Sequence, residues 1–123
     1  MATILVIDDD AAMRRIVVRM LEGTKHRILE AKDGQHGLAL LAQHGADLVI
    51  TDIIMPEKEG IQTIREIQER SPDTKIIAMS GGGMSRNLMF LDVARAFGAD
   101  VALAKPFKPQ ELIEAIDRLL PAV

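Results

Sequence analysis

Short aliphatic runs alternate with longer segments whose apolar residues recur at helical spacing, and this pair of patterns repeats five times along the chain. The aliphatic runs contain few polar residues, which is typical of strands that are buried on both faces of a parallel sheet. The predicted strands are Ile4–Ile7, Arg27–Ala31, Asp47–Thr51, Lys75–Met79 and Val101–Ala104. The predicted helices are Ala11–Leu21, Gln35–Gln43, a segment marked by Ile61, Ile64 and Ile67, Asn87–Phe97, and a last helix from Pro109 to Leu120. The pattern therefore predicts one three-layer α/β domain, with a five-stranded parallel sheet between five helices.

Four of the five predicted strands end at a polar side chain that can take part in chemistry. Asp8 and Asp9 follow the first strand, Asp52 the third, Ser80 the fourth and Lys105 the fifth. Parallel strands present their carboxyl ends at one edge of the sheet, where ligands bind in this architecture, so we expect these residues to lie close together. A polar residue at one strand end often marks only the contact with solvent, but that explanation is weak for the whole set.

Three carboxylates at close quarters repel one another, so a site that contains them requires a compensating cation. Oxygen ligands without histidine or cysteine suit a hard ion, which favours Mg²⁺. Mg²⁺ and Lys105 together would balance the charges of Asp8, Asp9 and Asp52. A near-neutral site of this kind can accept a phosphoryl group. Asp52 is then the candidate nucleophile, and the product would be an acyl phosphate.

The composition excludes several classes of function. The 123 residues include 15 basic and 18 acidic side chains, for a formal net charge of −3, and no basic stripe suggests direct nucleic-acid binding. No run of about 18 apolar residues is present, so no membrane insertion is expected. The chain has no cysteine, which excludes disulfides and thiolate metal sites and fits a reducing, cytoplasmic location.

Four motifs occur in order over nearly the whole chain: I-L-V-I-D-D-D, T-D-I-I-M-P, I-I-A-M-S-G and K-P-F. In these motifs the sequence resembles the receiver domain of bacterial two-component response regulators, particularly the single-domain chemotaxis type. The resemblance implies a flavodoxin-like, doubly wound fold with strand order 2-1-3-4-5. It also implies that residues 1–123 form one receiver domain without an effector domain.

The resemblance implies a set of metal ligands. Asp9 and Asp52 would bind Mg²⁺ directly, and Asp8 would contribute through water. The main-chain carbonyl of Ile54 would be a third protein ligand, which any side chain at that position allows.

The resemblance also implies roles in phosphoryl transfer. Asp52 would be the phosphoacceptor, Ser80 would turn its hydroxyl toward the phosphoryl group, and Lys105 would pair with that group. Pro106 would follow a cis peptide bond that aims the lysine into the site.

Three positions depart from the usual family pattern. Ala102 replaces an aromatic residue whose rotamer often reports activation, which puts the aromatic half of the switch in doubt. The resemblance implies that Ile54 and Gly82 would stand beside the path of the hydrolytic water, so they bear on the lifetime of the phosphoryl group.

The function that follows is a phosphoryl-accepting signalling switch. The donor would be a histidine kinase or a histidine phosphotransfer protein, and the output a changed binding surface for a downstream protein. Such a domain is not an enzyme for a separate substrate, and it catalyses only its own Mg²⁺-dependent phosphorylation and dephosphorylation.

Two other classes remain as alternatives. A phosphatase of the haloacid dehalogenase type would use the D-x-D spacing of Asp8 and Asp10, but the chain is short for that fold with a cap. A flavin-binding electron carrier shares the strand order, but the chain has no Trp or Tyr to flank the flavin ring.

Overall fold

The computed structural model describes residues 2–53, 60–80, 92, 95–96 and 98–120. The strands are β1 (Thr3–Ile7), β2 (Arg27–Ala31), β3 (Leu48–Asp52), β4 (Lys75–Ser80) and β5 (Val101–Ala104). The helices are α1 (Ala11–Met20), α2 (Gly34–His44), α3 (Gly60–Arg70) and α5 (Pro109–Leu119). All five predicted strands are confirmed, and their ends differ from the prediction by at most one residue.

The described residues form four helices, whereas the sequence pattern predicted five. The fourth predicted helix, over residues 87–97, falls mostly outside the described residues, although Asp92, Arg95 and Ala96 are helical. None of the described helices combines the length and the apolar composition needed to cross a lipid bilayer.

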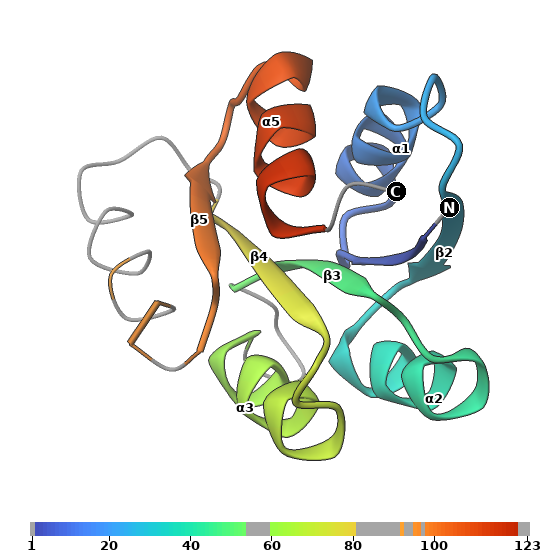
Figure 1. Ribbon diagram of the computed structural model, residues 1–123, viewed down its shortest axis with the longest axis vertical. Coiled ribbons are helices and arrows are strands. Elements are labelled where there is room, and N and C mark those ends of the chain that lie inside the picture. Colours follow the sequence, from blue (N-terminus) through green and yellow to red (C-terminus); the bar gives the residue numbers. More distant parts are fainter. Residues whose placement is uncertain (1, 54–59, 81–91, 93–94, 97, 121–123) are drawn as a thin grey trace.

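The five strands form one parallel sheet in the order β2-β1-β3-β4-β5, which confirms the expected 2-1-3-4-5 order (Figure 1). Ile7 of β1 pairs with Thr51 of β3, so Asp8 and Asp52 follow at the same level of the sheet. Ser80 of β4 pairs with Ala104 of β5, the residue before Lys105. The register alone therefore brings these strand ends to one edge.

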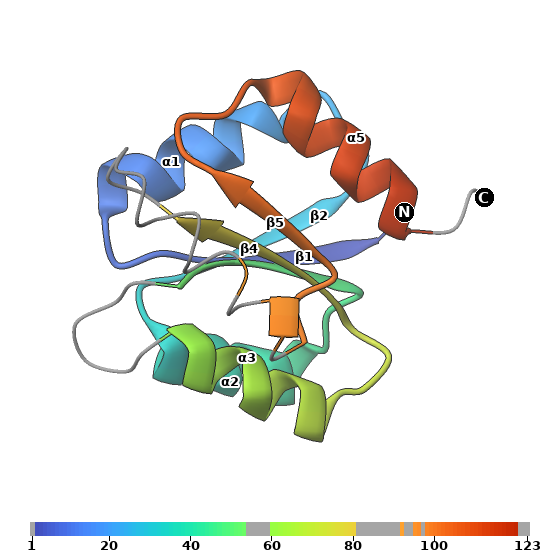
Figure 2. The same cartoon turned by 90° about the vertical axis from the view of Figure 1, so that its left-hand side faces the viewer.

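The helices lie in two layers, with α1 and α5 on one face of the sheet and α2 and α3 on the other (Figure 2). Alternate residues of β1 enter two separate cores: Leu5 and Ile7 pack with α2 and α3, whereas Ile4 and Val6 pack with α1 and α5. Both faces of the sheet are thus buried, which explains why the strands are almost uninterrupted aliphatic runs. Each fully buried side chain of this size stabilises the fold by about 1.5–3 kcal/mol.

Carboxylates begin two of the helices. Asp10 caps α1, where one carboxylate oxygen accepts hydrogen bonds from the main-chain N–H groups of Ala12 (2.9 Å) and Met13 (3.2 Å). Asp33 caps α2 and accepts from the N–H of His36 at 2.8 Å. These bonds satisfy main-chain donors that have no partner within a helix. The cap at Asp10 also ties the start of α1 to the polar edge of the sheet.

Gly60, the first residue of α3, lies directly against the end of β3. Its N–H donates to the carbonyl of Ile53 at 3.2 Å, and a Cβ at this position would overlap the Cα of Ile53 and the carbonyl oxygen of Asp52. The groups in contact belong to the main chain, so they cannot move aside by changing a rotamer. The absence of a side chain at Gly60 therefore lets α3 begin where Asp52 ends its strand.

We predict that Gly60→Ala lowers the free energy of unfolding by about 1–3 kcal/mol, the usual cost of overpacking a filled site. Gly23→Ala is the matched control, because a Cβ at Gly23 meets no atom within 4 Å. Urea unfolding followed by far-ultraviolet circular dichroism measures both. Equal stabilities for the two variants would show that α3 can shift away from the strand at little cost.

Candidate functional site

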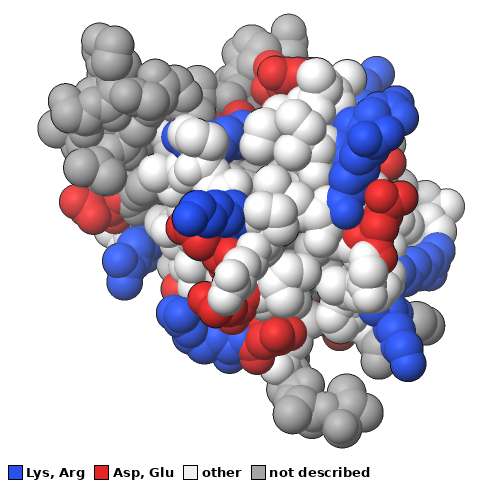
Figure 3. All heavy atoms as spheres, turned by 90° about the horizontal axis from the view of Figure 1, so that it is seen from above, with Lys and Arg blue, Asp and Glu red and all other residues white. Residues whose placement is uncertain are grey.

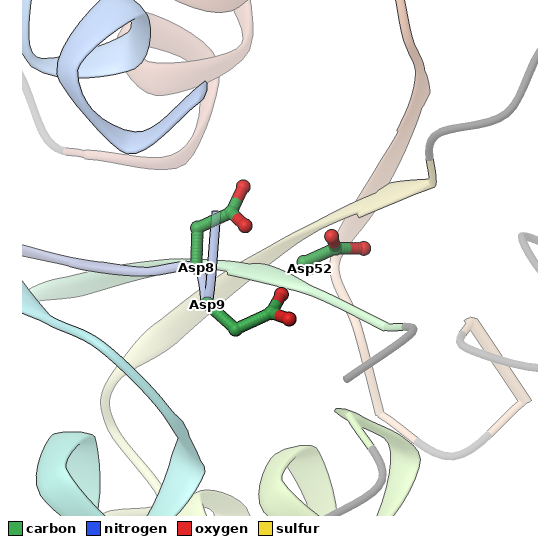
Figure 4. Close-up of side chains that lie close together, drawn as sticks. All are labelled: Asp8, Asp9 and Asp52. Carbon is green, nitrogen blue, oxygen red and sulfur yellow. The ribbon is translucent and has the colours of Figure 1, made fainter. Parts of the chain in front are cut away.

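The polar residues that follow the strands lie together at one edge of the sheet. Asp8 and Asp9 come from the end of β1 and stand beside Asp52 at the end of β3 (Figure 4). Ser80 ends the neighbouring strand β4, and Lys105 follows β5. These are the five side chains that the sequence pattern predicted to converge, and the sheet order is the reason that they do.

Lys105 forms ion pairs with two carboxylates of this cluster. Its Nζ lies 3.2 Å from Oδ2 of Asp8 and 3.2 Å from Oδ2 of Asp52. Only 13% of the lysine side chain is exposed, and the side chain of Asp8 is fully buried. One ammonium group thus pairs with two carboxylates that belong to different strands. With Asp9 included, the cluster has three carboxylates against one ammonium group in the described part of the chain, so an excess of negative charge remains there.

Asp8 is held on both of its carboxylate oxygens. Oδ1 accepts a hydrogen bond from the main-chain N–H of Asp10 at 2.9 Å, and Oδ2 accepts from Lys105. Burial raises the pKa of Asp8 and the nearby charge of Asp52 adds to the rise, whereas the Asp10 hydrogen bond and Lys105 oppose it. The carboxyl group of Asp8 is therefore set in place by the protein itself.

Asp8, Asp9 and Asp52 each offer a carboxylate oxygen, and these oxygens lie within 4.8 Å of one another. Three hard oxygen donors with excess negative charge fit Mg²⁺, which is usually bound by one or two carboxylates and several waters. Asp9 is exposed, so the cluster is open to solvent on its side and has room for such waters. The donor set therefore fits the metal that the sequence predicted. Ile54, whose carbonyl was expected as a further ligand, lies outside the described residues.

Ser80 is fully buried, and its Oγ has no hydrogen-bond partner among the described residues. A buried hydroxyl without a partner costs about 1–3 kcal/mol, so such an atom calls for an explanation. Asp52 pairs with Met79 across the ladder, which puts Ser80 one residue further along the neighbouring strand. The hydroxyl group therefore lies at the same edge of the sheet as the carboxylates and makes no hydrogen bond to the described residues.

Lys105 reaches the site from a main chain that is itself anchored there. Its N–H donates to the carbonyl of Ser80 at 2.8 Å, which links the ends of β5 and β4. The peptide bond between Lys105 and Pro106 is cis, as the resemblance implied.

Arg14 is the residue of this region that the sequence did not single out. Its Nη1 donates to the main-chain carbonyl of Asp8 at 2.7 Å, and its Nε donates to Glu30 of β2 at 3.2 Å. In the sequence Arg14 is one of three arginines on α1 and has no motif of its own. Only the pairing of β1 with β2 brings Glu30 within its reach.

Two features expected from the sequence concern the connection after β4. Residues 81–83, the triple-glycine segment that includes Gly82, lie outside the described residues. Ala102 is half-buried on β5 and lines a surface hollow of about 360 Å³ between β5 and α5. Position 102 of β5 thus carries a small side chain in place of an aromatic one, and this side chain borders the hollow.

A family model described as the response regulator receiver domain matches residues 4–117. The chemotaxis protein CheY of Bacillus subtilis is 34% identical over 118 residues, which cover 95% of this chain and 96% of that protein. The DNA-binding transcriptional regulator NtrC of Azospirillum brasilense is 35% identical over 120 residues, but the match covers only 24% of its length. The chain thus spans about a quarter to a half of several longer regulators that it matches.

Solved structures give the same result. Chemotaxis protein CheY4 of Vibrio cholerae superposes with a TM-score of 0.84 at 28% identity, over 98% of this chain and 99% of that one. The receiver domain of NtrX from Brucella abortus superposes with a TM-score of 0.88 at 30% identity, over 95% and 97% of the two chains.

The position of Lys105 predicts how the metal-free protein responds to its loss. Lys105→Met removes the ammonium group that pairs with the buried carboxylates of Asp8 and Asp52, and we expect the free energy of unfolding to fall by about 1–3 kcal/mol in buffer with a chelator. Lys25→Met, in the exposed turn between α1 and β2, is the matched control and should change stability by less than about 0.5 kcal/mol. If both variants unfold at the wild-type denaturant concentration, the lysine does not stabilise the carboxylates.

Proposed function

The chain belongs to the response regulator receiver domain family, whose members are phosphoryl-accepting switches of two-component systems, and we propose that Asp52 is its phosphoacceptor. The observation that carries this assignment is the pairing of Asp52 with Lys105, together with the Ser80 hydroxyl at the end of the neighbouring strand, which has no partner in the described part of the chain. A carboxylate, an ammonium group and a hydroxyl donor are the groups that a bound phosphoryl group requires. Asp52 also ends the central strand β3, with a strand on each side.

In the proposed reaction a carboxylate oxygen of Asp52 attacks the phosphorus of a phosphohistidine on the donor. An O–P bond forms, the P–N bond breaks, and the imidazole leaves with the electron pair and takes a proton. The ammonium group of Lys105 then pairs with a phosphoryl oxygen in place of its present contact with Asp52. The Ser80 hydroxyl donates a hydrogen bond to another phosphoryl oxygen, which gives a partner to an atom that has none among residues 2–53, 60–80 and 98–120.

We propose that Asp9 and Asp52 hold Mg²⁺ directly, with Asp8 acting through water and the Ile54 carbonyl as a further ligand. The bound ion supplies positive charge that offsets the carboxylates and the incoming phosphoryl oxygens. The close approach of the three carboxylate oxygens supports this assignment. The two fixed contacts on Asp8 support its indirect role, because both of its oxygens already accept hydrogen bonds.

The acceptor assignment predicts the labelling of the protein by acetyl phosphate. Wild type should be labelled in the presence of Mg²⁺, and excess chelator should remove the labelling because a phosphoryl dianion must otherwise approach three carboxylates. Asp52→Asn should abolish labelling, whereas Asp73→Asn, at an exposed position, should leave it unchanged. Incorporation of radiolabelled phosphate measures each case. Strong labelling of Asp52→Asn, or labelling that survives the chelator, would contradict the assignment.

A receiver domain is a signalling switch, so its turnover concerns its own acyl phosphate and no separate substrate is transformed. The matching family model is the response regulator receiver domain, and the similar proteins named above are response regulators. These similarities do not support the two alternative classes, an aspartyl-nucleophile phosphatase and a flavin-binding carrier.

We propose that phosphorylation changes the protein surface through a movement of the ends of β4 and β5. The main-chain bond from Lys105 to Ser80 joins these two strand ends, so a movement of Ser80 toward the phosphoryl group also displaces β5. The hollow at Ala102 lies on this path, between β5 and α5. The output surface for a downstream protein would then include β5 and α5.

The phosphoryl donor, a histidine kinase or histidine phosphotransfer protein, would dock beside the site on α1. Met13 of α1 is half-buried and packs against the core. Ile16, one turn further along α1, is 47% exposed. Figure 3 looks onto α5 and α1 and shows a strip of uncharged residues with charged side chains of both signs on either side. Exposed apolar side chains with polar neighbours are typical of docking surfaces.

Docking through α1 predicts that Ile16→Ala slows phosphoryl transfer from the protein donor about tenfold, equivalent to about 1.4 kcal/mol. Labelling by acetyl phosphate should keep its wild-type rate, because a small donor does not contact this surface. Gln43→Ala, exposed near the end of α2 on the opposite face, is the control for both donors. Equal losses with the protein donor and with acetyl phosphate would mean that the substitution disturbs the site and not docking.

A further inference from the structure

Arg14 links three elements that meet at the acidic edge of the sheet. It belongs to α1, it donates to the carbonyl oxygen at the end of β1, and it pairs with Glu30 of β2. Neither contact involves a group to which the proposed reaction assigns a role. Arg14 therefore links the start of α1 to the end of β1, across the turn that contains Asp8, Asp9 and Asp10.

The contacts of the acidic pair are unequal. The carboxylate of Asp8 is tied to Lys105 and to the N–H of Asp10. The carboxylate of Asp9 has no hydrogen-bond or ion-pair partner among the described residues, and the residue is exposed. The direction of the Asp9 side chain therefore depends on its main chain. The Asp8 carbonyl, to which Arg14 donates at 2.7 Å, belongs to the peptide that joins Asp8 to Asp9.

We propose that Arg14, oriented by Glu30, is a positioning residue that holds the Asp8–Asp9 peptide so that the Asp9 carboxylate faces the metal site. This inference rests on the proposed function, because it requires that Asp9 bind Mg²⁺. A guanidinium group suits the task, since its planar fork can donate to a carbonyl and a carboxylate at once. Glu30 is half-exposed and Arg14 is largely buried, so solvent weakens the ion pair on the glutamate side and its main consequence is the orientation of the arginine.

Arg14 could act as a nearby positive charge or as the group that positions the Asp8–Asp9 peptide. These two roles predict opposite effects of its removal on Mg²⁺ affinity. If the arginine acted only as a nearby positive charge, its removal would make the site more negative and Mg²⁺ binding tighter. If it holds the peptide, its removal frees Asp9 and weakens binding. Groups that orient metal ligands typically contribute 10–100-fold to metal affinity. The sign of the change therefore separates the two explanations.

The experiment is a MgCl₂ titration of the full chain, followed by the backbone amide shifts of Asp9 and Asp10. This readout reports the Kd of the folded molecules and needs no phosphoryl donor. Arg14→Gln should weaken Mg²⁺ binding about tenfold. Arg14→Lys keeps the charge but loses the fork, and we expect an intermediate Kd. Arg15→Gln is the matched control, because it removes the same charge from an exposed neighbour on α1 and should leave the Kd unchanged or slightly lower.

Glu30→Gln tests the orienting contact, and it should weaken binding alone but add little to Arg14→Gln. The inference is overturned if Arg14→Gln binds Mg²⁺ as tightly as Arg15→Gln, even when unfolding shows that it is less stable than wild type. In that case Arg14 supports only the fold, and the proposed metal site stands. A wild-type chain whose amide shifts do not respond to MgCl₂ would overturn the metal site and, with it, the role of Arg14.

Discussion

The repulsion among carboxylates at one edge of the sheet is the constraint on which the rest of the site depends. Asp8 and Asp52 come from adjacent strands, and the sheet register leaves them no freedom to separate. Lys105 holds them together, with its Nζ 3.2 Å from an oxygen of each. A lysine cannot neutralise three carboxylates, so the site retains an affinity for further positive charge. This excess of negative charge is the feature of the site that suits the proposed divalent cation.

The rigidity of this edge comes from the two cores beneath it. Every residue of β3 is buried, and its neighbours β1 and β4 are buried nearly throughout. Such strands cannot slip by one residue, because each side chain would then face the wrong core. The strand ends are consequently fixed relative to one another, whereas the polar side chains at these ends differ in how far they are held. Ser80 illustrates the combination, since its main chain is paired with β5 but its hydroxyl has no partner among the described residues.

The strands and most of the candidate site could be predicted from the sequence because both depend on local patterns. Uninterrupted aliphatic runs indicated a sheet buried on both faces, and the residue after each run indicated the edge. The resemblance to receiver domains supplied the strand order and the cis peptide before Pro106, which periodicity cannot supply. The exposure of Ile16 and the partial burial of Met13 could not be predicted, because both occupy apolar positions on α1 and only tertiary packing distinguishes them.

The sequence by itself determined which residue types end each strand, and hence the chemistry of the site: hard oxygen ligands, one lysine, one hydroxyl and no thiol. Tertiary structure alone decided which of these groups are already engaged. Asp8 has both oxygens occupied, Asp9 is exposed, and Arg14 donates to Glu30 and to the Asp8 carbonyl. The physical reason is that burial and hydrogen bonding depend on neighbours that are distant in the chain. Residue type sets what a side chain can do, and the sheet register and helix packing set which partner it meets.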